Sequence, residues 1–103
     1  MHERTDEIRN STTQDIEVWF EPWGMPHNLP SGKSFTVVST SAVEGQLEIE
    51  HSENTIIVYA FPSATLKVFL EGALIDDFNI KFPDLPPQMT TKSFVNFFFG
   101  HPQ

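Results

Sequence analysis

Both tryptophans of this sequence lie within five residues of each other, in the segment from Trp19 to Pro26. This segment is the first candidate binding site, because Trp19, Glu21, Trp23 and Met25 combine large apolar groups with one carboxylate. The carboxylate is expected to accept a hydrogen bond from an indole N–H or from a ligand. The alternative is a loop that folds its tryptophans under the sheet as a cover for the core, because large aromatic residues are mostly buried.

A second concentration of aromatic residues lies near the C-terminus, at Phe94 and Phe97–Phe99. The three consecutive phenylalanines cannot all face inward, on a helix or on a strand. We therefore count Phe98 and Phe99 as candidate binding residues. An exposed apolar patch here would mark an interface, and a two-fold homodimer is the commonest form of one. The alternative is that the segment packs against the sheet of its own chain.

Histidine and carboxylate side chains offer an alternative function, in which His27, His51 and Glu21 hold a metal ion. Such a site would resemble that of the cupins, small β-barrels that bind metal through His and Glu. The paired histidines of the cupin pattern are absent from the sequence. Asp76 and Asp77 could supply an acid/base pair, but neighbouring residues of a strand point to opposite faces, which favours a solvated turn or bulge.

The sequence contains no nucleophile elbow, phosphate loop or dinucleotide fingerprint. We therefore expect a non-catalytic binding or protein-interaction module without a cofactor. The net charge of −8 disfavours nucleic acids and anionic membranes as partners. The sequence has no cysteine, which is compatible with a cytoplasmic location.

Short alternating apolar segments, separated by turn residues every 8–12 positions, predict an all-β fold. We expect six or seven antiparallel strands in a small β-sandwich or open barrel. Residues 15–100 form the single predicted domain, after a mobile polar arm at 1–14 and before a tail at 101–103. Residues 90–99 are assigned to a short helix docked on the sheet, although phenylalanine and valine also favour strands.

The strand at residues 56–61 is continuously apolar, so it is expected at the centre of a sheet with both faces covered. Glu71-Gly72 is predicted to form a tight turn. The predicted core contains inward-facing residues of the alternating segments, namely Ile16, Val18, Phe35, Val37, Leu47, Ile49, Ile56, Val58, Leu66, Val68 and Leu70. Trp19 lies on the opposite strand face from Val18 and Phe20, where it would cover the sheet, beneath the C-terminal phenylalanines.

Overall fold

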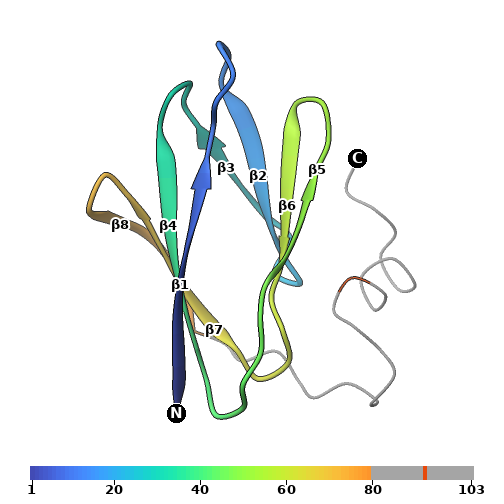
Figure 1. Cartoon of the computed structure of the whole chain (residues 1–103), viewed down its shortest axis with the longest axis vertical. Helices are drawn as coiled ribbons and strands as arrows, with labels where there is room; N and C mark the ends of the chain where they lie inside the picture. The colour runs from blue at the N-terminus through green and yellow to red at the C-terminus, as the bar shows by residue number, and fades with distance from the viewer. Residues whose placement is uncertain (80–91, 93–103) are drawn as a thin grey trace.

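Eight β-strands make up the part of the protein that the computed structural model describes, residues 1–79 and Lys92 (Figure 1). They form a first sheet of order β1-β4-β7-β8 and a second sheet of order β3-β2-β6-β5. The strands are β1 (His2–Arg9), β2 (Ile16–Glu21), β3 (Met25–Leu29), β4 (Ser34–Ser41), β5 (Glu48–His51), β6 (Thr55–Tyr59), β7 (Thr65–Leu70) and β8 (Ala73–Phe78). The predicted all-β fold is thereby confirmed.

The core lies between the inner faces of the two sheets, where both contribute alternate residues. In β2, Ile16, Val18 and Phe20 are buried in this core, and β4 adds Phe35 and Val37. The predicted core residues are buried with two exceptions. Ile49 is 38% exposed and Leu70 is only partly buried, because β5 is an edge strand and Leu70 ends β7.

The strand predicted at residues 56–61 is β6, which lies between β2 and β5 as expected for a central strand. Its residues from Ile56 to Tyr59 are all buried. Its pairing with β2 is parallel, which corrects the expectation of antiparallel strands throughout. Between the two paired strands, the polypeptide leaves the second sheet to form β4 in the first sheet. It then returns to the second sheet for β5 and β6.

Two strands were not predicted, and both lie at sheet edges. Residues 1–14 were expected to form a mobile arm, whereas β1 pairs with β4 over its whole length and buries Ile8. An edge strand gains backbone hydrogen bonds on one side, so a polar sequence can form one. The other is β3, whose Pro26 is tolerated because β3 pairs only with β2.

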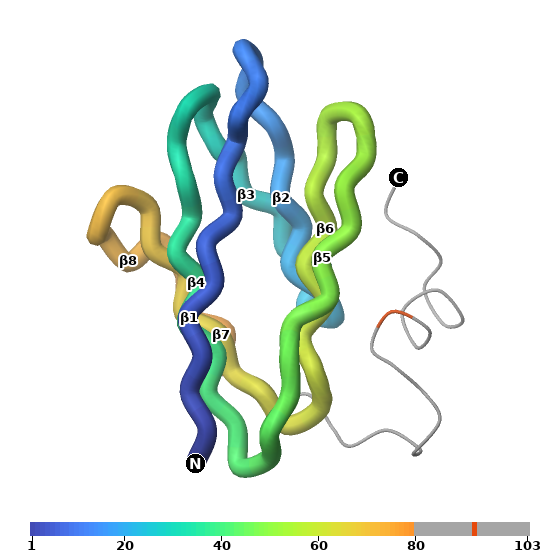
Figure 2. Tube along the Cα trace, viewed as in Figure 1, coloured from blue at the N-terminus to red at the C-terminus, as the bar shows by residue number. Residues whose placement is uncertain are grey.

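The predicted turn at Glu71-Gly72 joins β7 to β8, and both residues have positive φ angles, of 50° and 84°. This pattern is that of a type I′ turn, whose twist suits a β-hairpin. Figure 2 shows that this hairpin projects away from β5 and β6. The predicted helix at residues 90–99 lies outside the described residues, apart from Lys92. In the described ranges, no helix has the length and hydropathy of a membrane span.

Candidate interaction surface on the outer face of the second sheet

The outer face of the second sheet carries the side chains that alternate with its core residues. Because Val18 and Phe20 of β2 point into the core, Trp19 and Glu21 point outward. In β6 the buried core residue Val58 likewise leaves Ile57 and Tyr59 on the outer face. The parallel register sets Trp19 beside Ile57 and Glu21 beside Tyr59. Two aromatic side chains, one aliphatic and one carboxylate therefore meet on this face.

Strand β5 adds two carboxylates to the same surface. Glu48 pairs with Tyr59 and Glu50 pairs with Ile57, and cross-strand partners share a face of the sheet. We call this surface the acidic aromatic face and define it by Trp19, Glu21, Glu48, Glu50, Ile57 and Tyr59. It joins three strands that are far apart in the sequence, so its residues come together only through the β2–β6 and β5–β6 pairings.

The apolar centre of the acidic aromatic face is shielded from solvent. Ile57 is 0% exposed and Tyr59 is 1% exposed, although both point away from the core between the sheets. Together they form a second buried cluster, against which Trp19 packs. The Trp19 indole N–H donates a hydrogen bond of 2.7 Å to Glu17 on the same face. The outer face of such a sheet is commonly solvated, so this burial distinguishes the surface.

Three carboxylates act electrostatically on the hydroxyl group of Tyr59. Its pKa is raised to about 12, first by burial and then by the negative charges of Glu50, Glu21 and Glu48, and its hydroxyl is hydrogen-bonded to Glu50. Burial and neighbouring negative charges both disfavour the ionised phenol. The face thus combines an apolar centre with an electronegative rim.

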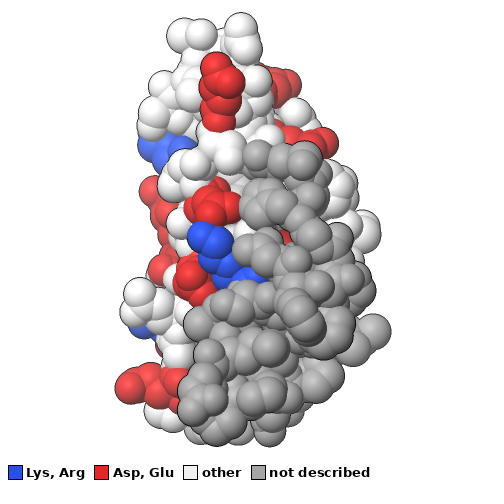
Figure 3. Space-filling model, turned by 90° about the vertical axis from the view of Figure 1, so that its right-hand side faces the viewer, with Lys and Arg blue, Asp and Glu red and all other residues white. Residues whose placement is uncertain are grey.

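A cation meets this rim from outside the sheet. Lys92 Nζ lies 2.5 Å from Glu50 Oε2, and both side chains are partly exposed. The hydrogen bond to Glu50 and the charge of this carboxylate raise the pKa of Lys92. Figure 3, which views the side that carries β5 and β6 in Figure 1, shows that acidic side chains predominate over basic ones in its described part. The acidic aromatic face therefore accepts a lysine.

The structure divides the predicted Trp19–Pro26 site between two surfaces. Trp19 and Glu21, which is only 5% exposed, belong to the acidic aromatic face. Trp23 instead stacks on Phe78 of β8, with ring centroids 4.9 Å apart, and packs against the main core. Met25 is 45% exposed on β3. The candidates Phe98 and Phe99 lie outside the described residues.

The proposed metal ligands His27, His51 and Glu21 do not converge, which corrects the cupin-like alternative. His27 pairs in register with Val18, Val18 with Ile56, and Ile56 with His51. The two histidines are thus three strand spacings apart, roughly 14 Å. Within residues 1–79 and Lys92, no group of three His, Asp or Glu residues is placed to hold a metal ion.

His27 has a structural partner across the sandwich. Its Nε2 lies 2.7 Å from Asp76 Oδ2, which joins edge strand β3 of the second sheet to edge strand β8 of the first. The imidazole ring also lies edge-on to Phe20, Phe35 and Phe78. Asp76, a candidate for acid/base chemistry on sequence grounds, therefore closes one side of the sandwich.

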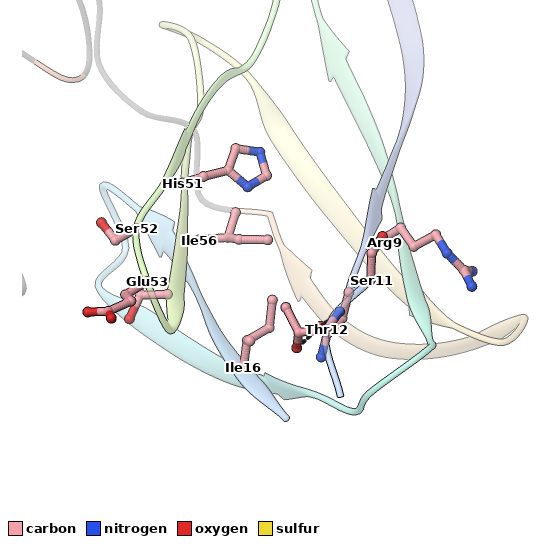
Figure 4. A pocket seen from close by; sticks show the side chains of 10 residues that line it. Arg9, Ser11, Thr12, Ile16, His51, Ser52, Glu53 and Ile56 are labelled. Atoms are coloured by element: carbon pink, nitrogen blue, oxygen red, sulfur yellow. Dashed lines mark hydrogen bonds between the residues drawn. The ribbon is translucent and has the colours of Figure 1, made fainter. Parts of the chain in front are cut away.

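A pocket of about 220 Å³ opens on the other side, between the end of β1 and the turn from β5 to β6. Figure 4 shows the His51 ring and the Ile16 and Ile56 side chains directed toward it, whereas the Arg9 guanidinium points away. This arrangement supplies apolar contact and one imidazole.

Comparison with known proteins adds no functional information, because no family model, curated protein or solved structure matches this protein. Sequence reasoning identified Trp19 and Glu21 but missed the other members of the acidic aromatic face. The signal available for Ile57 and Tyr59 was the unbroken apolar run of β6, which requires cover on both faces. Glu48, Glu50 and Lys92 could be recognised only through the strand register and the ion pair.

Proposed function

We propose that this protein is a non-catalytic protein-interaction module whose binding surface is the acidic aromatic face. The observation that carries the proposal is the apolar centre that Ile57 and Tyr59 form on a face that points away from the core between the sheets. Residues at these positions favour an apolar partner over water. The expected partner is an extended peptide segment that places apolar side chains over Ile57 and Tyr59 and a lysine against Glu50.

The chemistry of the rim supports this choice of partner. Glu21, Glu48 and Glu50 all act on Tyr59 electrostatically, which concentrates negative potential beside an apolar centre. A cationic group relieves this potential, as Lys92 does at Glu50. Charge complementarity of this kind gives an interface specificity and fast association, while the buried apolar centre supplies most of the affinity.

The strand arrangement supports a preformed site. Ile57 and Tyr59 belong to the central strand β6, and they are held between β2 and β5 by backbone pairing on both sides. Side chains on such a strand change position little on binding, which lowers the entropic cost of association. The exposed Met25 lies on β3, at an edge of the same sheet, and could extend the contact area.

The test is selection of random peptides displayed on phage against the immobilised full-length protein. We expect enrichment of segments that combine lysine with large apolar residues. The double variant Glu48→Gln, Glu50→Gln should lose the binding of enriched peptides. The matched control Glu3→Gln, Glu7→Gln makes the same change of net charge on β1 and should retain it, because these exposed residues lie in the first sheet.

Equal binding by both double variants would refute the proposed surface. Failure to enrich any lysine-bearing apolar sequence, on both the unmodified protein and its Lys92→Glu variant, would refute the proposed partner class.

A further inference from the structure

We infer that the C-terminal segment of the same molecule, residues 80–103, occupies the acidic aromatic face as an intramolecular ligand. A partner segment of similar chemistry would then have to displace it. This inference rests on the proposed function, because it assigns an occupant and a mode of regulation to the same surface.

The first support is the ion pair between Lys92 and Glu50. Lys92 is the described residue beyond Asn79, and its Nζ lies 2.5 Å from Glu50 Oε2 on the acidic aromatic face. A surface ion pair of this kind contributes little stability, so it serves to locate the segment and does not by itself hold it in place. Lys92 therefore lies at the outer face of the second sheet.

The second support is the burial of the apolar centre next to that point. Glu50 pairs in register with Ile57, which is 0% exposed, and the neighbouring Tyr59 is 1% exposed. Trp19 packs on one side of this pair but belongs to the same sheet. A sheet residue cannot cover the whole face on which it stands, so further apolar cover is required from another part of the molecule.

The third support is the composition of the C-terminal segment. Residues 80–103 contain five of the ten phenylalanines of the protein, at Phe82, Phe94 and Phe97–Phe99. Burial of such large apolar side chains is favourable, so a segment that carries five of them favours association with an apolar surface.

The fourth support is that the net charge has opposite signs in the described strands and in the C-terminal segment. Residues 1–79 carry four basic and thirteen acidic side chains, a net charge of −9, whereas residues 80–103 carry two basic and one acidic, a net charge of +1. The segment is thus the cationic part of an acidic protein. Its charge is opposite to that of the carboxylate rim, so attraction favours docking.

The connection is long enough for this arrangement within one molecule. Residues 80–91 can span about 40 Å when extended. The end of β8 lies in the first sheet, and packed sheets are about 10 Å apart, so the connection can pass around the sandwich to the outer face of the second sheet. A second copy is therefore not required to supply the occupant.

Solvent exposure of Trp19 tests the inference in the full-length protein. With Trp23→Phe in the background, Trp19 is the one remaining tryptophan, and acrylamide, being uncharged, is not repelled by the acidic rim. We expect the quenching constant to rise at least about twofold with Lys92→Glu, because repulsion replaces the ion pair, and further with Phe97→Ser, Phe98→Ser, Phe99→Ser. The matched control Lys67→Glu changes an exposed lysine of β7 and should leave quenching unchanged.

A synthetic peptide of residues 80–103, added to the triple Phe variant, should restore the shielding of Trp19. The same peptide should bind the unmodified protein at least about tenfold more weakly, because the face is already occupied. Circular dichroism of each variant checks that the sandwich remains folded.

Unchanged quenching in the folded triple variant would overturn the inference. So would a light-scattering mass of a dimer that becomes monomeric in that variant, since the segment would then bind a second copy. Failure of the proposed function gives a different result: the variants would expose Trp19 as expected, yet no displayed peptide would bind the opened face.

Discussion

The ionisation of Tyr59 provides a direct measure of the environment on the acidic aromatic face. Burial and the negative charges of Glu50, Glu21 and Glu48 raise its pKa to about 12. The protein has a single tyrosine, so its tyrosinate absorbance reports this residue alone. We expect a titration midpoint near 12 in the folded protein, against about 10 for the denatured protein.

The same shift predicts how stability depends on pH. The folded state favours the neutral phenol, so the contribution is fully present below pH 10 and is lost as the pH rises toward the folded-state pKa of about 12. One pKa unit corresponds to about 1.4 kcal/mol, so a shift of about two units predicts a loss of about 2–3 kcal/mol. Tyr59→Phe should remove this part of the pH dependence, because phenylalanine does not ionise.

Absorbance titration and urea unfolding at a series of alkaline pH values test both expectations. Glu50→Gln should lower the Tyr59 midpoint, because it removes the largest of the three charge effects on the phenol while retaining an acceptor. Glu3→Gln on β1 is the control and should leave the midpoint unchanged. A folded-state midpoint near 10 would refute the reasoning, because burial and the neighbouring negative charges would then have no effect on the phenol.

Two further substitutions test the interior. Phe78→Ala should destabilise the fold by about 3–5 kcal/mol in urea unfolding and shift the Trp23 emission to the red, because it removes a buried ring on which Trp23 stacks; an unshifted spectrum would contradict the stacking. Asn10→Ala should cost about 1–3 kcal/mol, since the buried amide donates a 2.9 Å hydrogen bond to the Leu29 carbonyl. The exposed Asn54→Ala is its control, and equal losses for the two would argue against this role.

The alternating segments of the sequence predict the strands that carry the core, because period-two patterns record a strand with one buried face. Val18 in β2, Val37 in β4 and Val68 in β7 were all placed correctly in the core. The turn at Glu71-Gly72 was also predicted, because glycine adopts positive φ without strain. These features depend on local sequence alone.

Edge strands and strand order do not follow from local sequence in the same way. In β1 only Ile8 is buried, so its pattern resembles that of a solvated arm until β4 supplies the pairing. In β3, Pro26 argues against a central strand but not against an edge. The parallel pairing of β2 with β6 is a property of the whole topology, and no alternation pattern distinguishes it from an antiparallel one.

The candidate site illustrates why a functional surface on a sheet is harder to predict than its core. Alternation correctly placed Trp19 on the face opposite Val18, and the apolar run of β6 indicated that Ile57 and Tyr59 need cover. Alternation within one strand could not show that Glu50, some thirty residues from Trp19 in sequence, lies on the same face. That depends on the registers in which β2 and β5 pair with β6.

The strand register also changes how the carboxylates of β5 are interpreted. Alternating glutamates in β5 indicate a solvated strand face, and Glu48 is indeed exposed. Once β5 pairs with β6, however, Glu48 and Glu50 stand beside a buried tyrosine and raise its pKa. This negative charge favours the approach of a cation, and Lys92 lies against Glu50. The apolar centre and the carboxylates beside it together support our proposal that the occupant is a lysine-bearing apolar segment, of the same molecule or of a partner.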